Sequence, residues 1–241
     1  MNKKGYYANN SVEALNEKKN EMRKYAEHLI QKGVKIADPH RVDFRGALVF
    51  GKNVSIDINV IFEGKVDLGD NVAIGANCII IDSVIGSQSI IKPFSLVEGA
   101  IVGNNTFIGP YGRIRPGAVL KNFVQIGNFV EVKNSTIKDG SRVNHLSFIG
   151  DADLEENVTI GAGTITCNHD GHKTNHTFIG KGSYVGSGSN LIAPIKLGEG
   201  VTIGAGSTIN KDVAKGKLAI ARARQIIIEN WKNLKEKKDG R

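Results

Sequence analysis

The sequence has 241 residues, a formal net charge of +8 and only 6% aromatic residues. Its two cysteines, Cys78 and Cys167, are too few for a disulfide framework. The start MNKKGYYANN lacks the apolar core of a signal peptide, and no apolar run approaches the roughly 18 residues of a membrane span. Because the basic residues are scattered and gather mainly at the two ends, the charge indicates small anionic ligands at least as well as nucleic acid. We therefore expect a cytoplasmic protein with no membrane span and no nucleic-acid partner.

Residues 10–32 are predicted to form a helix. Asn10 with Glu13 makes a capping pair, and Gly33 is a plausible stop. One face of this helix would carry Leu15, Met22, Tyr25, Ala26 and Leu29. The helix has no core of its own, so we treat residues 1–45 as an N-terminal helix and lead-in to the next segment.

Residues 46–213 carry an aliphatic side chain at almost every sixth position. The positions are Phe62, Leu68, Ile74, Ile80, Val102, Ile108, Ile114, Leu120, Ile126, Val132, Val185, Leu191, Leu197, Ile203 and Ile209. Neither a helix nor a flat strand has this period, whereas a solenoid with three short sides per coil needs one inward aliphatic on each side. Gly or Ala often follows the aliphatic, as corners with little room for a Cβ would require.

The period predicts an all-β solenoid, a left-handed parallel β-helix of hexapeptide repeats, which is an exception to the usual right-handed crossover. At roughly 18 residues per coil it should be about nine coils tall. After Val213 the period ends, and residues 214–241 are predicted to form a C-terminal helix or tail. The one large interruption lies between Thr166 and Ile179 and holds the polar stretch CNHDGHKTNHT. Excursions from a regular scaffold are where functional sites tend to lie.

Three polar residues of the solenoid are candidates for chemistry. His145 lies between two inward positions, so it should sit on an outer face, where a lone histidine often has no function. Arg115 and Lys133 are 18 residues apart and should project outward from adjacent coils, which is how a phosphate site is made. Glu131 leaves another interpretation open, because it could simply pair with either cation.

Six segments resemble the C-terminal acetyltransferase half of the bifunctional UDP-N-acetylglucosamine pyrophosphorylase and glucosamine-1-phosphate N-acetyltransferase family. They are DPHRVDFRGALVFGKNVSIDINVIFEG, GPYGRIRPGAVL, VQIGNFVEVKNS, NHLSFIGDADL, NVTIGAGTITCNHDG and SGSNLIAPIKLGEGVTIGAGSTIN. The resemblance runs from about residue 13 to Arg222 and includes the family's linker helix. The Gly-rich nucleotide loop of the family's N-terminal half, of the LAAGxGTRM kind, does not occur in this sequence, so no uridylyltransferase activity is expected of this chain.

The resemblance implies an acetyl-coenzyme A-dependent N-acetyltransferase for an amino-sugar phosphate, glucosamine 1-phosphate or a close relative, in UDP-N-acetylglucosamine biosynthesis and cell-envelope precursor synthesis. It makes His145 the general base and Glu131 a carboxylate that helps hold the site. The implied acceptor-binding residues are Arg115, Lys133, Phe148, Thr159, Asn168 and Thr174. The implied acetyl-coenzyme A residues are Ala162, Asn168, His169, Ser187, Ala205 and Arg222, with the backbone amide of Ala162 as the oxyanion donor. The family's sites lie between neighbouring subunits, so a homotrimer is implied.

Four positions depart from the family pattern. The family has Tyr at Phe148, Asn at Thr159, Lys at Thr174 and Tyr at His169. Because the departures cluster on the acceptor side, two alternatives stay open: an acyltransferase for a different amino sugar or nucleotide sugar, and a catalytically silent trimeric scaffold.

A metal site is a further alternative for the polar stretch. Its His169, His172 and His176 could suggest ligands like those of the γ-class carbonic anhydrases, which share this fold. No further histidine of the solenoid lines up with them convincingly, so we expect no metal to be required for acyl transfer.

Overall fold

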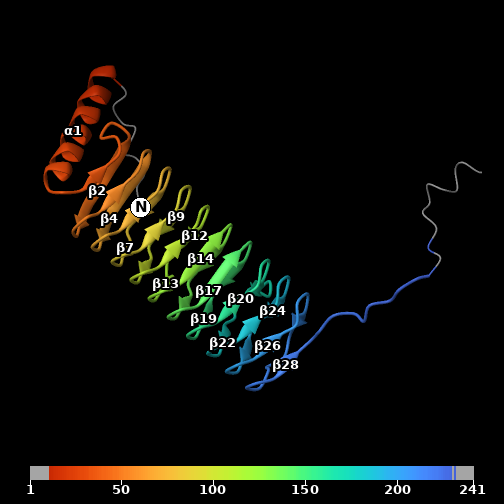
Figure 1. The fold of residues 1–241 in the computed structure, drawn as a ribbon. Helices are drawn as coiled ribbons and strands as arrows, with labels where there is room; N and C mark the ends of the chain where they lie inside the picture. The colour runs from red at the N-terminus through yellow and green to blue at the C-terminus, as the bar shows by residue number, and fades with distance from the viewer. Residues whose placement is uncertain (1–10, 230, 232–241) are drawn as a thin grey trace, which may run out of the picture.

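The computed structural model describes residues 11–229 and 231, which form a long solenoid with a helix at its N-terminal end (Figure 1). Helix α1 spans Val12–Gln31 and begins at Ser11, whose side chain accepts a hydrogen bond from the amide of Ala14. The predicted capping pair is therefore wrong: Ser11 has the extended backbone of a cap, while Asn10 lies outside the described residues. Gly33 follows the helix with φ +96°, as a stop requires.

The strands form three parallel ladders, one on each side of the prism. The first face consists of β1 (Lys35–Ile36), β3 (Ser55–Ile56), β5 (Ala73–Ile74), β8 (Ile90–Ile91), β11 (Phe107–Ile108), β14 (Gln125–Asn128), β17 (Arg142–His145), β20 (Thr159–Ile160), β23 (Tyr184–Val185), β26 (Thr202–Ile203) and β28 (Leu218–Ala219). The second face consists of β6 (Ile79–Ile81), β9 (Leu96–Glu98), β12 (Arg113–Ile114), β15 (Glu131–Lys133), β18 (Phe148–Gly150), β21 (Ile165–Cys167), β24 (Asn190–Ile192) and β27 (Thr208–Ile209).

The third face consists of β7 (Val84–Ile85), β10 (Ile101–Val102), β13 (Val119–Leu120), β16 (Thr136–Ile137), β19 (Ala152–Leu154), β22 (Thr177–Ile179) and β25 (Ile195–Leu197). Two strands of nine residues, β2 (Val42–Phe50) and β4 (Val60–Leu68), run along the second and third faces in turn. They join these two faces into one 17-stranded sheet, while the first face is a separate 11-stranded sheet.

The core is the column of inward aliphatic side chains that the six-residue period predicts. Ile114 lies opposite Val132, and Val132 lies opposite Ile149, so each coil repeats the inward position of the coil before it. Every aliphatic position predicted from the period is buried, with at most 5% of the residue exposed. The fold prediction of a left-handed parallel β-helix is confirmed.

The solenoid is longer than the sequence predicts. It has about 10 turns instead of nine. The first face begins at β1, before residue 46, and β28 adds a strand after residue 213. At the C-terminal end the period is lost because Ala219 stands opposite Ile203 in place of a larger aliphatic residue, whereas at the N-terminal end Ile36 lies opposite Ile56 and continues the inward column.

The small residues that follow the inward aliphatics make room for the next coil. A Cβ on Gly186 would lie 2.5 Å from the nitrogen of Ala205, and one on Gly103 would lie 2.6 Å from the carbonyl carbon of Lys121. The prediction of little room for a Cβ is thus confirmed. The chain turns two positions further on, where residues with positive φ such as Asn105 and Gly188 stand.

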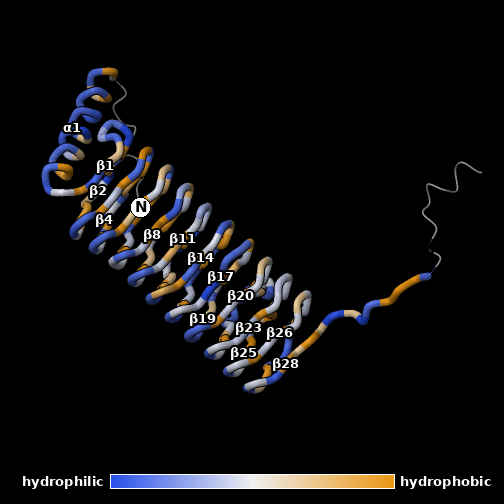
Figure 2. Tube along the Cα trace, in the orientation of Figure 1, coloured by the Kyte–Doolittle hydropathy of each residue, from blue (hydrophilic) through white to orange (hydrophobic). Residues whose placement is uncertain are grey.

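Beyond β28 the chain leaves the prism and extends away from it (Figure 1). Up to Glu229 no helix forms, so of the predicted helix or tail the structure shows a tail. Ile226, Ile227 and Ile228 are at least 66% exposed, which Figure 2 shows as an apolar stretch outside the body. Among the described residues, no helix has the length and apolarity that crossing a membrane takes.

Candidate active site

His145 ends β17 at the corner between the first and second faces, and its side chain is exposed as the sequence predicts. Its Nδ1 lies 2.7 Å from Oδ1 of Asn128, the residue opposite it in β14. Because an amide oxygen only accepts, this contact places the imidazole proton on Nδ1 and leaves the lone pair on Nε2. His145 is therefore held in the tautomer that a general base needs.

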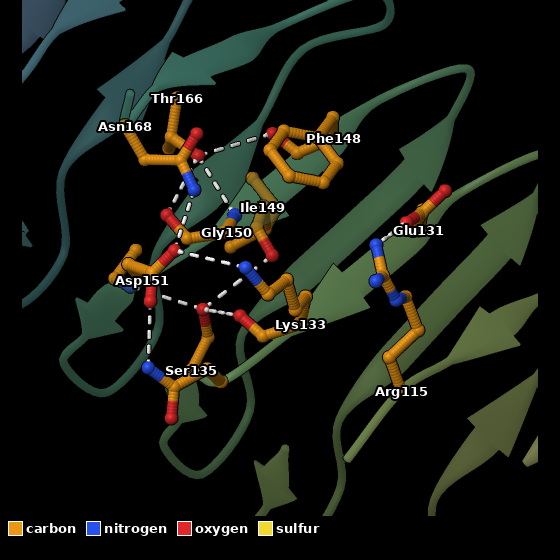
Figure 3. Close-up of polar contacts among 12 residues, drawn as sticks. Arg115, Glu131, Lys133, Ser135, Phe148, Ile149, Gly150, Asp151, Thr166 and Asn168 are labelled. Carbon is orange, nitrogen blue, oxygen red and sulfur yellow. Dashed lines mark hydrogen bonds and ion pairs between the residues drawn. The ribbon is translucent and has the colours of Figure 1, made fainter. Parts of the chain in front are cut away.

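The second face carries the two predicted phosphate-binding cations (Figure 3). Nη1 of Arg115 lies 2.6 Å from Oε1 of Glu131. Nζ of Lys133 lies 3.7 Å from Oδ2 of Asp151. Each cation thus has its own carboxylate, and Glu131 pairs with a cation, which was the alternative left open by the sequence. A phosphate would be held here by N–H donors more than by excess positive charge.

Asp151 has the most contacts of the residues in this group. Its Oδ1 accepts a hydrogen bond from Asn134 at 2.6 Å, and its Oδ2 accepts one from Asn168 at 2.5 Å. Burial alone would raise the pKa of this carboxyl. The hydrogen bonds from Asn134 and Asn168 and the nearby charge of Lys133 outweigh burial, and they hold the pKa below its ordinary value.

Phe148 begins β18 beside these groups, and its ring lies over the backbone of the same strand (Figure 3). A Cβ on Gly150 would lie 2.5 Å from Cζ of Phe148 and 2.9 Å from Nδ2 of Asn168. Only glycine leaves this surface open between Phe148, Lys133 and Asn168. Phe148 contributes an apolar ring to this surface, where the family pattern given in the sequence analysis has the hydroxyl group of a tyrosine.

The other predicted acceptor residues lie apart from this group. Thr159 lies on the first face, opposite Arg142. Thr174 pairs with His169, which is one of the predicted acetyl-coenzyme A residues, across the excursion that follows β21, and both are exposed. Asp170 stabilises the excursion by accepting hydrogen bonds from the amides of Lys173 and His172. These bonds hold the pKa of Asp170 well below its ordinary range. Among the described residues of one chain, no side-chain hydrogen bond or ion pair joins Thr159, His169 or Thr174 to the second-face group.

Four of the predicted acetyl-coenzyme A residues follow His145 along one corner of the prism, while the other two, Asn168 and His169, lie at the start of the excursion after β21. The amide of Gly163 donates to the carbonyl of His145 at 3.1 Å, and the amide of Gly188 donates to that of Ala162 at 2.7 Å. One coil further, the amide of Gly206 donates to the carbonyl of Ser187 at 2.8 Å. Ala162, Ser187 and Ala205 are therefore stacked in successive coils above His145. Arg222 comes next, with Cδ 3.9 Å from where a Cβ on Gly206 would stand.

The size of the residues at this corner changes at His145. In the three coils before it and in its own coil, the corner positions with positive φ are large and exposed, and they are Phe94, Tyr111, Phe129 and Leu146. The rings of Phe94, Tyr111 and Phe129 stack with centroids 5.0 Å apart. In the coils after it the corner positions are Gly163, Gly188 and Gly206. We call these seven residues the His145 corner. The His145 corner therefore carries bulky side chains up to the coil of the histidine, and glycines without side chains in the coils that follow.

Two hollows in the described part of the chain can be compared with the predicted site. One of about 360 Å³ is lined by His145, Asn144, Asn128, Tyr111 and Phe129, so it adjoins the candidate base. A larger one of about 760 Å³ lies where the end of α1 meets the first face. None of the predicted site residues lines the larger hollow, so the smaller one, which His145 lines, belongs to the candidate site.

The three histidines of the excursion do not gather. Nε2 of His176 lies 3.1 Å from Oδ2 of Asp153, while Nδ1 of His169 accepts a hydrogen bond from the amide of Gly171. Within residues 11–229 and 231, no group of three His, Cys, Asp or Glu side chains is placed to hold a metal ion.

Two residues of the site, Asn128 and Asp151, were not predicted, and neither was Asn134, which contacts Asp151 but is not one of the predicted substrate residues. Asn128 precedes His145 by 17 residues and Asn134 precedes Asp151 by 17, the length of a shortened coil. Asp151 itself stands beside Gly150 and looks in the sequence like an ordinary turn residue. A search for polar pairs 17 or 18 residues apart would have found both contacts.

Comparison with known proteins agrees with the fold. Residues 44–128 match the GMPPB C-terminal domain, and residues 176–211 match the bacterial transferase hexapeptide family of six repeats. The chain is 51% identical over 215 residues to the bifunctional protein GlmU of Chromobacterium violaceum, covering 89% of this chain and 47% of that protein. It is 49% identical over 214 residues to the GlmU of Marinobacter nauticus, again with 89% and 47% coverage.

A solved structure of UDP-N-acetylglucosamine acyltransferase from Campylobacter jejuni is similar at a TM-score of 0.48 and 20% identity, covering 78% of this chain and 71% of that one. Similarity this low carries no information about activity. The chain spans about half the length of the curated relatives that it matches, and the matched part is their C-terminal half. The chain is thus a homologue of the C-terminal half of the bifunctional GlmU proteins, built from hexapeptide repeats of the bacterial transferase kind.

Proposed function

We propose that this chain transfers the acetyl group of acetyl-coenzyme A to the amine of an amino-sugar phosphate, glucosamine 1-phosphate or a close relative. The observation that carries the proposal is the contact between His145 and Asn128, which leaves Nε2 of an exposed imidazole as a base. The second face beside it presents Arg115 and Lys133 to a phosphorylated acceptor. The resemblance to the GlmU proteins supports the same activity and a role in UDP-N-acetylglucosamine and cell-envelope precursor synthesis.

In the proposed reaction, Nε2 of His145 accepts a proton from the acceptor amine as its nitrogen attacks the thioester carbonyl. The carbonyl oxygen becomes an oxyanion that needs a donor. Within the described residues, the amide of Ala162 donates no hydrogen bond to the protein, so it remains for this oxyanion. When the C–S bond breaks, the imidazolium returns its proton to the departing thiolate of coenzyme A.

The donor would lie along the side-chain-free half of the His145 corner. Ala162, Ser187 and Ala205 leave room there for the extended pantetheine arm, and Arg222 stands where the nucleotide phosphates would arrive. Acetyl-coenzyme A is thus a substrate of the proposed reaction, and His145 performs its proton transfer without a metal.

The proposed assembly is a homotrimer. Thr159 lies on the first face while the main acceptor group lies on the second, so a face from a second copy would be needed to complete the site. Exposed apolar residues support the same assembly: Phe129 and Leu146 at the His145 corner are at least 54% exposed, and Ile226 in the tail is 83% exposed. A cytoplasmic location, where acetyl-coenzyme A and sugar phosphates occur, belongs to this proposal.

The test measures thiol release from acetyl-coenzyme A with glucosamine 1-phosphate, other amino sugars and UDP-amino sugars. We expect release with a phosphorylated amino sugar and a loss of about 10²- to 10⁴-fold in the His145→Ala variant, with unchanged binding of acetyl-coenzyme A. Release with UDP-amino sugars alone would identify a different acceptor. A trimer that binds acetyl-coenzyme A but acetylates none of these compounds would favour the silent scaffold.

A further inference from the structure

The carboxylate of Asp151 lies at the corner between the second and third faces, where its side chain is only 10% exposed. Both oxygens are in use: Oδ1 accepts from Asn134, while Oδ2 accepts from Asn168 and lies near Lys133 (Figure 3). Lys133 and Asn168 are two of the predicted substrate residues, and they come from different coils. One buried carboxylate therefore contacts two separate parts of the candidate site.

The backbone of the same residue connects these parts as well. The amide of Asp151 donates to the carbonyl of Lys133 at 3.0 Å, and its own carbonyl accepts from the amide of Thr177 at 3.1 Å. Asn168 and Thr177 stand at the two ends of the polar excursion. Asp151 thus fixes the base of the excursion to the strand that carries Lys133.

The two side-chain contacts set the directions of the substrate-binding groups. A carboxylate only accepts, so Asn168 must turn its Nδ2 toward Asp151 and its Oδ1 away from it. Nζ of Lys133, at 3.7 Å from Oδ2, is too far for a hydrogen bond. Its charge is balanced and its position is set, while its N–H groups remain available to a phosphate.

We propose that Asp151 is a positioning residue, which orients the Asn168 amide and the Lys133 ammonium toward the phosphorylated amino-sugar acceptor. The inference rests on the proposed function and adds to it a residue that makes no contact with the reacting atoms. It predicts a defect in acceptor binding that is distinct from a loss of stability.

The experiment compares steady-state kinetics of the whole 241-residue chain and its Asp151→Asn variant. The new amide presents a donor where one of the two asparagines needs an acceptor, so Asn168 or Asn134 loses its partner. We expect KM for glucosamine 1-phosphate to rise about 10- to 100-fold, as for a lost hydrogen bond to a charged group, while KM for acetyl-coenzyme A changes less than about two-fold.

Asn134→Ala is the matched control. It removes a hydrogen bond from the same carboxylate, but Asn134 is not among the substrate residues, so its KM values should stay within about two-fold of wild type. In a second comparison, Asp151→Asn is added to Asn168→Ala. Because Asp151 would act through Asn168 as well as through Lys133, the double variant should lose less activity than the sum of the two single losses predicts.

Equal rises in both KM values, an equal defect in Asn134→Ala, or fully additive losses with Asn168→Ala would overturn the inference. If Asp151→Asn does not fold by circular dichroism, Asp151→Ser takes its place in the same comparison. A wild-type chain that acetylates no amino sugar contradicts the proposed function instead. Calorimetric titration with glucosamine 1-phosphate then decides about Asp151, because weaker binding by the variant supports its role and equal or absent binding by both proteins overturns it.

Discussion

Asn128 and His145 lie opposite each other in neighbouring strands, and the amide oxygen of one is 2.7 Å from the imidazole Nδ1 of the other. The strand register itself brings them together. A partner on Nδ1 fixes which nitrogen carries the proton and prevents the ring from rotating. The orientation of the proposed base therefore depends on a residue one coil away.

Asn128→Leu tests this dependence, because leucine has a similar size but accepts no hydrogen bond. We expect kcat for acetyl transfer to fall about 10-fold and KM for acetyl-coenzyme A to stay unchanged. Stopped-time assays of thiol release on both proteins provide the measurement. Wild-type kcat in Asn128→Leu would mean that the imidazole is oriented by some other group.

The regular part of this molecule could be predicted from the sequence because each inward position depends on one local requirement. Residues such as Ile114 and Leu191 face a narrow interior that only aliphatic side chains fill, so the period alone identifies them. The positions of His145, Arg115 and Lys133 on outer surfaces follow from the same period.

The polar contacts were less predictable because they join residues in different coils. The sequence shows that Lys133 points outward, but its pairing with Asp151 depends on how far the two side chains turn at a corner. Helix α1 illustrates a second limit: Ser11 and Asn10 are both good caps by type, and the backbone at Ser11 decides between them.

The side-chain-free half of the His145 corner predicts that a bulky residue there blocks acetyl-coenzyme A. Gly188→Leu places a leucine at φ +68°, close to the φ +53° that Leu146 adopts at the same corner, so we expect the fold to lose only about 1 kcal/mol. Its KM for acetyl-coenzyme A should rise at least about 10-fold, measured by thiol release at saturating acceptor.

Gly182→Leu is the control for strain. Gly182 has φ +65° and stands at a different corner, where a Cβ would meet nothing within 4 Å. Its melting temperature should fall as much as that of Gly188→Leu, with normal kinetics. Normal acetyl-coenzyme A kinetics in Gly188→Leu would place the donor elsewhere.

The lowered pKa of Asp151 predicts a pH-dependent contribution to stability. The folded protein favours the ionised carboxylate, so this stabilisation is present above the usual aspartate pKa of about 3.9 and is lost as the pH falls through the lower folded value. Asp151→Asn should therefore melt below wild type near neutral pH, and the difference should shrink below about pH 4. Calorimetric melting across this range is the measurement.

Thr177→Val is the control for a change in stability that does not depend on pH. Its Oγ1 is the one buried side-chain oxygen or nitrogen without a hydrogen-bond partner among the described residues. Replacing the hydroxyl with a methyl group should stabilise the protein by about 1 kcal/mol at every pH, since neither side chain titrates. A difference between Asp151→Asn and wild type that stays constant down to acid pH would show that the carboxylate is not stabilised by folding.

The last prediction concerns the acceptor, for which Phe148, Thr159 and Thr174 depart from the family pattern given in the sequence analysis. Phe148 places an apolar ring beside Gly150, and Thr159 and Thr174 are shorter than the residues that the family pattern has there. If these positions set the acceptor, restoring Tyr, Asn and Lys together should raise kcat/KM for glucosamine 1-phosphate. Each regained polar contact is worth about 1 kcal/mol, so three would give on the order of 100-fold.

The comparison needs Phe148→Tyr, Thr159→Asn and Thr174→Lys singly and combined, with glucosamine 1-phosphate and UDP-amino sugars as acceptors. Because Thr159 lies on the first face and Thr174 in the exposed excursion, the three positions meet at one acceptor only in an assembly of several copies. Gain of activity in the combined variant would thus also support the trimer, and a trimer-breaking dilution should abolish it. Efficient turnover of glucosamine 1-phosphate by the unmodified chain, with no gain on restoration, would show that the departures are neutral and that neighbouring groups such as Lys173 supply the missing contact.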